Sequence, residues 1–338
     1  MTTERTALVL GGSGGIGGET ARALTRHGWA IRALSRDAEK AGARAAAAGD
    51  HWQWVPGDAM DRASVVAAAK DTSVILHAVN PPGYRNWGGL VLPMIENTIE
   101  AARASDARIL LPGTIYNYGP DAFPLLSEDS PQHPATRKGR IRVEMEQRLA
   151  HAADDGVRSL VLRAGDFFGP QPGQSWFSQG MVKPGKPVRT ITMPGRKGVG
   201  HSWAYLPDVA ETFACLVERE ASLARFERFH FGGIWDADGL QMAEAIRRAA
   251  GDPGIKVKKL PWTLMGLMSP FDETVREMME VRPLWQEPIR LDNARLVAFL
   301  GAEPATPLDQ AIEATLRGLG CLPPPSVRTE ERRSTASA

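Results

Sequence analysis

The sequence contains very little cysteine. Among its 338 residues only Cys215 and Cys321 occur, far apart and without the close spacing of metal-binding motifs. A disulfide framework or a zinc site is therefore not expected, and two free thiols fit a reducing compartment. We expect a cytoplasmic protein with no bound metal.

An excess of charge and long apolar runs are also absent. The chain has 40 basic and 39 acidic side chains, so no global field would attract nucleic acid or an anionic membrane. No run approaches the roughly 20 apolar residues that span a bilayer, and no charged leader precedes an apolar stretch. We expect a small-molecule ligand, with no nucleic-acid or membrane partner.

Glycine, in contrast, is concentrated near the amino terminus. Residues 7–10 predict a buried strand, residues 16–24 a helix with apolar positions four apart, and residues 30–34 a second buried strand. Gly28 is typical of a left-handed helix end. This order is that of a βαβ dinucleotide-binding unit. A structural turn in a fold without a ligand is the alternative.

The turn between the first strand and the helix has a GxxGxxG pattern, formed by Gly11, Gly14 and Gly17. Gly11 permits a sharp reversal, Gly14 lets the backbone approach a pyrophosphate, and Gly17 lets helix and strand pack closely. Free N–H groups at the start of the helix would hold the phosphates. The residues expected to bind them are Gly11, Ser13, Gly14, Gly15, Ile16 and Gly17.

The end of the second strand bears on the choice between NAD and NADP. An NAD-binding chain usually places an acid there, against the ribose 2′-hydroxyl, but this chain has Ser35 and Arg36. A guanidinium beside a hydroxyl suits a 2′-phosphate, so we favour NADP over NAD. Asp37 is the reservation, since a small shift at the strand end would offer it to the ribose. Alternatively, Arg36 only lines the surface.

Two later strand ends are expected to contact the cofactor. Asp58 and Ala59 follow a short strand, where the Asp58 carboxylate would accept a hydrogen bond from the adenine amine. Helix capping is the alternative, and Asp61 fits that role better. Four residues after the next strand should lie beneath the ribose and nicotinamide, because ligands bind outside the carboxyl ends of parallel strands. They are His77, Ala78, Val79 and Asn80, of which we expect His77 to be a packed histidine that offers backbone contacts.

Taken in order, these and later motifs resemble those of the extended short-chain dehydrogenase/reductases, which include the NAD-dependent epimerases and dehydratases. The later motifs are GTIYNYG at 113–119, LRAGDFFGP at 162–170 and Asp208-Val209-Ala210. The similarity spans residues 5–320. It implies an α/β fold: a Rossmann-type doubly wound parallel sheet with a smaller, mostly helical C-terminal substrate lobe.

The resemblance also implies a division of the chain. The dinucleotide-binding domain would comprise residues 1–167 with 203–232, and the substrate lobe residues 168–202 with 233–321. Residues 322–338 have nothing to bury and predict a disordered tail. Pairing of two copies through a four-helix interface, as a homodimer, follows from the resemblance alone.

The resemblance implies a substrate-polarising hydroxyl, which Thr114 matches, and a tyrosine and lysine four apart on a later helix. Lys138 stands where the tyrosine belongs and Arg142 where the lysine belongs. Arg142 would still bind ribose hydroxyls through its fork, but arginine does not shuttle protons. Lys138 would serve as the acid–base group if burial beside cations favours its neutral form. Tyr116 and Tyr118 are alternative acids, and an ordinary solvated helix with paired charges is the rival interpretation.

No acidic residue occurs between Phe167 and Pro207, although the stretch is rich in cations and glycine-proline punctuation. We interpret it as a substrate wall that would favour a carboxylate, phosphate or nucleotide-bearing ligand. A flexible, solvated crossover is the alternative. The cations are Lys183, Lys186, Arg189, Arg196 and Lys197.

The leading functional prediction is therefore an NADP-dependent oxidoreductase that acts on a carbonyl, alcohol or sugar-like carbon. An epimerase or dehydratase that retains its cofactor is a variant of this chemistry. Because the catalytic tyrosine is missing, a non-catalytic NADP(H)-binding redox sensor is a separate alternative.

Overall fold

The central feature of the computed structural model is a seven-stranded parallel sheet. The structure describes residues 5–81, 86–171, 173 and 175–323. The strand order is β11-β7-β5-β4-β1-β2-β3, and every pair is parallel. The bounds are β1 Thr6–Leu10, β2 Ala30–Ser35, β3 Gln53–Pro56, β4 Val74–His77, β5 Arg108–Gly113, β7 Arg158–Arg163 and β11 Phe226–His230.

Helices cover both faces of this sheet, which is why its central strands are continuous buried runs. On one face α1 (Gly15–Arg26) packs against α6 (Leu206–Val217). On the other lie α3 (Arg62–Ala68), α4 (Trp87–Ser105) and α5 (Arg137–Asp154). The helix α2 (Ala38–Ala47) lies beside β3. The Rossmann-type prediction is confirmed.

The order of the strands reverses at β1, which lies between β2 and β4. The chain adds β2 and β3 on one side and the later strands on the other. Crevices outside the carboxyl ends of the strands at such a reversal are where open α/β sheets bind ligands. The glycine-rich turn after β1 is at this place.

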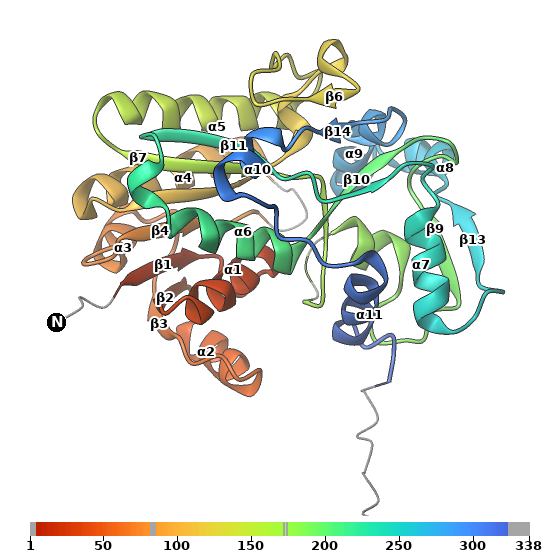
Figure 1. The fold of residues 1–338 in the computed structure, drawn as a ribbon, viewed down its shortest axis with the longest axis horizontal. Helices are drawn as coiled ribbons and strands as arrows, with labels where there is room; N and C mark the ends of the chain where they lie inside the picture. Colours follow the sequence, from red (N-terminus) through yellow and green to blue (C-terminus); the bar gives the residue numbers. More distant parts are fainter. Residues whose placement is uncertain (1–4, 82–85, 172, 174, 324–338) are drawn as a thin grey trace, which may run out of the picture.

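A smaller, mostly helical lobe lies beside the sheet, on the right of Figure 1. It has its own buried core, built largely from apolar and aromatic side chains. Its strands are β8 (Asp166–Phe168), β9 (Thr190–Met193), β10 (His201–Tyr205), β12 (Ile234–Asp236) and β13 (Lys256–Lys259). Its helices are α7 (Gln241–Ala250), α8 (Trp262–Met268), α9 (Glu273–Glu280) and α11 (Leu308–Gly318). A further strand pair joins β6 (Leu125–Leu126) to β14 (Arg290–Leu291).

The predicted division into domains stays a prediction, with one notable placement. The helix α10 (Ala294–Leu300), within the stretch assigned to the substrate lobe, packs against β11 of the large sheet. Its Leu296 is fully buried in the core of that sheet. Of the predicted tail, residues 324–338 lie outside the described residues, while Leu322 packs on the core of the smaller lobe.

Local capping at two helix ends follows the sequence. Gly28 has φ +78°, the left-handed geometry predicted for the end of α1. Asp61 caps α3 by accepting hydrogen bonds from the backbone of Ala63 and Ser64. Asp208 does not cap α6, because that helix begins two residues earlier. Its carboxylate instead accepts from the backbone N and hydroxyl of Thr306, at 2.7 and 2.6 Å.

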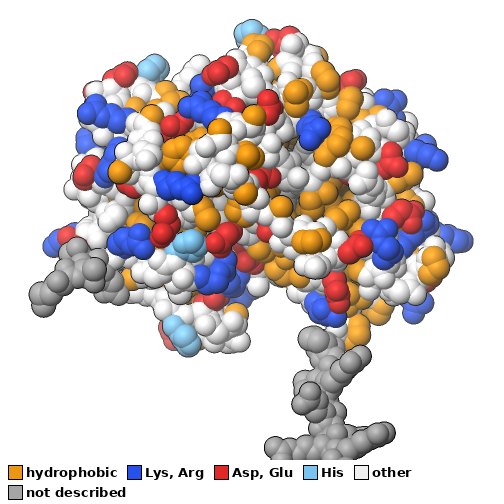
Figure 2. Space-filling view, in the orientation of Figure 1, with side chains coloured by type: hydrophobic (Ala, Val, Ile, Leu, Met, Phe, Trp, Pro, Cys, Tyr) orange, Lys and Arg blue, Asp and Glu red, His pale blue; other side chains and the backbone are white. Residues whose placement is uncertain are grey.

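Charge and hydropathy are distributed as expected for a chain with balanced composition. Figure 2 shows acidic and basic side chains interspersed over the face in view, with no broad area of one sign. Within the described part of the chain, no helix combines the length and apolar character needed to cross a bilayer.

Candidate functional site

The glycine-rich turn is packed so tightly that it requires glycine. Gly11 has φ +92°, and a Cβ there would lie 2.5 Å from the carbonyl oxygen of Ala78. A Cβ on Gly17 would lie 2.2 Å from the carbonyl oxygen of Gly11, which blocks any side chain between β1 and α1. A Cβ on Gly14 would meet the same oxygen at 3.3 Å. The turn therefore has the close-packed form of a phosphate-binding cradle and fits a dinucleotide.

Most predicted cofactor residues meet along one cleft that begins at this turn. It encloses a cavity of about 660 Å³ and runs past the carboxyl ends of β4 and β5 toward α5. Phe167, Gln171 and Leu206 are among the other residues that line it. The predicted residues on its lining are Ser13, Gly14, Gly15, Ile16, His77, Ala78, Val79, Asn80, Thr114 and Arg142.

A second cavity, of about 240 Å³, lies on the other side of the turn. Ser13 and Gly14 belong to both cavities, and Ser35 and Asp37 contribute the end of β2. The intervening Arg36 is exposed. An adenosine would fit here, between the turn and the end of β2.

The residues predicted to contact adenine are engaged within the protein. The Asp58 carboxylate accepts from the backbone N of Met60 at 3.0 Å. The carbonyl oxygen of Ala59 accepts from the amide of Asn97 at 2.9 Å. Neither residue is among the described residues that line the adenosine-sized cavity. Their adenine contact stays a prediction.

His77 is a packed histidine. Its Nδ1 lies 2.8 Å from the hydroxyl of Thr98, which donates its own proton to the carbonyl of Met94. His77 therefore donates from Nδ1 and keeps Nε2 as an acceptor. Burial, with the nearby Arg142 cation, lowers the pKa of His77 to about 3. The ring is neutral at physiological pH and is no proton donor to a reaction.

Beyond the far end of the cleft, a smaller cavity of about 160 Å³ lies between the two lobes. Three predicted catalytic residues, Thr114, Tyr116 and Arg142, line it together with Trp87 and Trp176. Six residues belong to both this cavity and the long cleft, so the two are continuous. They are Asn80, Thr114, Arg142, Phe167, Ser175 and Gln179.

The predicted catalytic residues in this cavity are held by local structure. The Thr114 hydroxyl accepts from the backbone N of Tyr116 at 3.3 Å, at the start of the short helix η2 (Ile115–Asn117). The guanidinium of Arg142 lies 5.1 Å from the centre of the Trp87 ring, within range of a cation–π interaction. Both are half-buried and placed to contact a ligand.

Lys138 points elsewhere. Its ammonium is fully buried and lies 2.5 Å from a carboxylate oxygen of Glu277 and 3.4 Å from one of Glu280, both on α9. It also donates to the carbonyl of Glu277 at 2.8 Å. Lys138 is not among the described residues lining either part of the cleft. The charge pattern of the α5 sequence did not indicate this partner, because Glu277 is 139 residues after Lys138 in the chain.

Tyr118 is not a candidate acid, and this alternative was wrong. Its hydroxyl lies in a buried network with His230 and Arg163, at 2.8 and 2.6 Å. Burial raises the pKa of the Tyr118 phenol above its ordinary value. Glu146 extends the network by pairing with Arg163. These groups fix the loop after β5 to the sheet.

Sequence reasoning missed an acid–histidine pair at the smaller cavity. Asp166 lines that cavity, and its Oδ2 lies 2.8 Å from Nε2 of His201. His201 is stacked on Trp285, with ring centres 3.8 Å apart and planes 10° apart. The RAGDFFGP motif contains Asp166 but predicted no role for its carboxylate. Its partner is 35 residues away and meets it because β8 pairs with β10.

Cations of the acid-free stretch gather at a third cavity, of about 590 Å³. Lys183, Lys186, Arg189 and Lys258 line it, and no acidic residue of the described chain does. It shares Gln179 and Gly180 with the smaller cavity.

A cluster of potential metal ligands, His27, Glu211 and Cys215, lies outside the cleft, where α1 meets α6.

Solved structures with the same fold cover nearly the whole chain. The UDP-glucuronic acid 4-epimerase of Bacillus cereus in complex with NAD has a TM-score of 0.70 at 15% identity, over 93% of this chain and 96% of its own. The UDP-glucose-4-epimerase of Stenotrophomonas maltophila, with NAD and formylated UDP-arabinopyranose, gives 0.71 at 14%, over 94% and 98%. The UDP-glucose 4-epimerase of Thermotoga maritima with UDP-glucose gives 0.69 at 16%, over 93% and 98%.

No curated protein matches the sequence. A family model does: the NAD dependent epimerase/dehydratase model matches residues 7–232, which include the glycine-rich turn, Thr114, Arg142 and Asp166. Because this match covers most of the chain and agrees with the sheet order and the cleft, the chain belongs to the NAD-dependent epimerase/dehydratase family of enzymes.

Proposed function

We propose that this enzyme moves hydride between the nicotinamide of NADP and a carbonyl or alcohol carbon held in the smaller cavity. The observation that carries this proposal is the continuity of the cleft. One set of walls runs from the glycine-rich turn to Thr114 and Arg142, and the six shared residues join the dinucleotide-sized part to the smaller cavity. A bound dinucleotide would supply hydride donation and acceptance at the nicotinamide.

Each side chain in the cavity has a proposed role. The Thr114 hydroxyl orients the reacting oxygen, and Arg142 binds the nicotinamide ribose through its fork. Asp166 takes the hydroxyl proton as the alcohol carbon gives up hydride, and it returns that proton in the reverse direction. His201 holds the Asp166 carboxylate in place. Tyr116, whose phenol is also on the described lining of this cavity, is the second candidate for the proton.

Lys138 would act through position and not through proton transfer. Its contacts join α5, which carries Arg142, to α9, which contributes Thr274 and Met278 to the cavity wall. The ammonium is ion-paired with α9 and donates to its backbone, and it is not among the described residues that line the cavity. This supports a role in holding α9 over the cavity.

The proposal of NADP depends on Arg36, an exposed cation directly after Ser35, which lines the adenosine-sized cavity. Asp37 lines the same cavity, and two of the structural neighbours were solved with NAD. NAD is therefore the alternative cofactor.

The proposed substrate is a sugar-like or other small compound with an anionic group. Two of the structural neighbours were solved with UDP-sugars. The four cations of the third cavity, which adjoins the smaller one, would hold the anionic group. The Asp166 carboxylate keeps that group away from the reacting carbon, since like charges repel.

Binding and turnover together test the proposed function. Purified protein is titrated with NADPH and NADH by nucleotide fluorescence, and then supplied with carbonyl compounds and with UDP-sugars. Binding followed by NADPH oxidation supports the oxidoreductase. Interconversion of a UDP-sugar without net oxidation supports the epimerase variant, whereas tight binding without either reaction supports the redox sensor. No binding of either dinucleotide would overturn all three.

A further inference from the structure

A separate cluster of ligand atoms lies where α1 ends against α6. The cluster consists of His27, Glu211 and Cys215, and one ligand atom from each lies within 4.8 Å of the other two. The structure points to a zinc site here, and we propose that the three side chains bind one Zn²⁺. The expectation of no bound metal was drawn from cysteine spacing, which takes no account of residues far apart along the chain.

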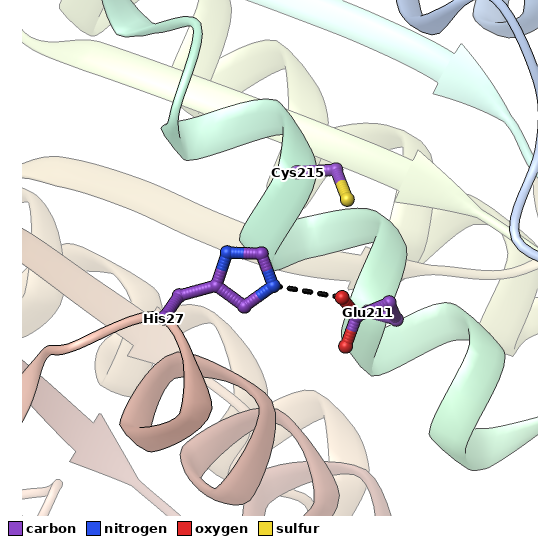
Figure 3. Close-up of side chains that lie close together, drawn as sticks. All are labelled: His27, Glu211 and Cys215. Carbon is purple, nitrogen blue, oxygen red and sulfur yellow. Dashed lines mark hydrogen bonds and ion pairs between the residues drawn. The ribbon is translucent and has the colours of Figure 1, made fainter.

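The two helices present these side chains to one another by their geometry. Glu211 and Cys215 are four residues apart on α6 and so lie on the same helix face. His27 is the residue that ends α1, and its ring turns toward α6. Figure 3 shows the ring opposite Glu211, with the Cys215 thiol one turn along α6. The extensive packing of α1 on α6 fixes this arrangement.

The surrounding side chains resemble the outer shell of a metal site. Glu218 places a carboxylate oxygen 3.6 Å from Nδ1 of His27, whereas Glu211 contacts the other ring nitrogen, Nε2. Metal-bound histidines usually have such a carboxylate at their second nitrogen, because it orients the ring and fixes the tautomer. Arg26 holds Oε2 of Glu211 at 2.8 Å, which directs Oε1 toward His27.

The ligand set selects the kind of metal. An imidazole, a carboxylate and a thiolate suit zinc, which takes nitrogen, oxygen and sulfur ligands in tetrahedral geometry. Nε2 of His27 and Oε1 of Glu211 are now 2.7 Å apart, as a hydrogen bond requires. Two ligands on one zinc are about 3.3 Å apart, from metal–ligand distances near 2.0 Å. A small rotation of the half-buried carboxylate therefore admits the ion, and water would take the fourth position.

Charged groups near the cluster would act on a bound dication in opposite directions. The Arg26 guanidinium repels a dication, as does Arg5, which pairs with Glu218. The two carboxylates, the thiolate and the carboxyl-terminal end of α1 all attract one. Zinc would connect the end of α1 to α6, and α1 begins at the glycine-rich turn. The site is thus distant from the chemistry and would stabilise the helix pair that borders the cleft.

Cobalt provides a direct test, since Co²⁺ replaces Zn²⁺ and a cobalt–thiolate bond gives a charge-transfer band in the near ultraviolet. Full-length protein, freed of metal by a chelator, is titrated with Co²⁺ and then Zn²⁺. We expect one Co²⁺ per chain, a thiolate band that Zn²⁺ abolishes, and an increase in melting temperature with Zn²⁺. Cys215→Ser should lose the band, and His27→Ala should bind at least tenfold more weakly.

Cys321→Ser is the matched control, because it removes the other free cysteine and leaves the cluster intact. It should keep the band. Cooperative thermal unfolding in the absence of metal would show that the Cys215 and His27 variants fold. Absence of stoichiometric binding to the native chain, or a band that survives Cys215→Ser, would overturn the proposal. Neither result depends on the proposed function.

Discussion

At the scale of single residues, the reaction depends on where a proton can go. By resemblance, Lys138 stands where the family's tyrosine is expected, and its ammonium lies against α9. Asp166 is the acid that lines the cavity next to Thr114, and His201 holds it. In our proposal the acid–base function therefore lies at the start of β8 and not on helix α5.

Asp166→Asn tests this directly. The amide cannot accept the proton, so we expect kcat on any substrate that the enzyme turns over to fall about 100-fold or more, the usual contribution of a general base. The dissociation constant for NADPH should not change. Asp129→Asn, an exposed carboxylate, is the control. Full activity in Asp166→Asn would transfer the role to Tyr116, which Tyr116→Phe would then examine.

The cofactor preference is a second prediction for one residue. Arg36→Ala should weaken NADPH binding about tenfold or more, since a hydrogen bond to a charged group contributes about 1.5–3 kcal/mol. NADH binding should change far less. Nucleotide fluorescence measures both affinities. Arg62→Ala, another exposed arginine, should leave both unchanged; equal losses for the two nucleotides in Arg36→Ala would refute the phosphate contact.

At the scale of elements, local patterns predicted the βαβ unit well and the long-range pairs poorly. A buried parallel strand and a glycine-rich turn each leave a continuous local pattern, so β1, α1 and β2 follow from residues 6–36. Strand β8 is three residues long within a loop-like stretch, and its partner β10 comes after an insertion. Nothing local indicates that Asp166 and His201 meet.

The contact between α5 and α9 illustrates the same limit and gives an element-scale prediction. Lys138→Met would remove the buried cation that contacts the Glu277 carboxylate and leave it the more exposed Arg137, at 3.5 Å. Breaking a buried pair costs about 3–5 kcal/mol of unfolding free energy. Urea unfolding measures the loss. Arg140→Ala, exposed on the same helix, should have little effect. A Lys138→Met protein as stable as the native one would mean that the pair contributes nothing.

At the scale of the whole molecule, two buried histidines make stability depend on pH. Burial and neighbouring arginines lower the pKa of both His77 and His230 from 6.5 to about 3. The unfolded chain therefore binds protons below pH 6.5 that the folded chain does not. Unfolding free energy should be fully retained above pH 6.5 and decrease as the pH falls from there toward 3.

The slope of unfolding free energy against pH is the measurable quantity. Two protons give at most about 2.7 kcal/mol per pH unit, from 1.36 kcal/mol for each. Urea unfolding between pH 7 and pH 5 should show stability falling, and His77→Gln should reduce the slope. His51→Gln, an exposed histidine, is the control. Stability that is unchanged or rising over this range in the native protein would contradict the assignment.

The architecture of the whole molecule could largely be predicted from the sequence. The α/β class, the doubly wound sheet and the helical second lobe all followed from pattern and resemblance, because they depend on strand order and burial. The homodimer and the cytoplasmic location stay predictions. The return of α10 to the large sheet was not foreseen, since its residues carry an ordinary helical pattern with no sign of which core they enter.

The six residues common to the long cleft and the smaller cavity have a kinetic consequence. A nucleotide lying in the cleft becomes part of the floor on which the second ligand rests. The second ligand therefore has a complete binding surface only after the nucleotide has bound. The nucleotide cannot dissociate while the second ligand covers it. Steady-state inhibition patterns should therefore be those of a compulsory sequence, with the dinucleotide first on and last off.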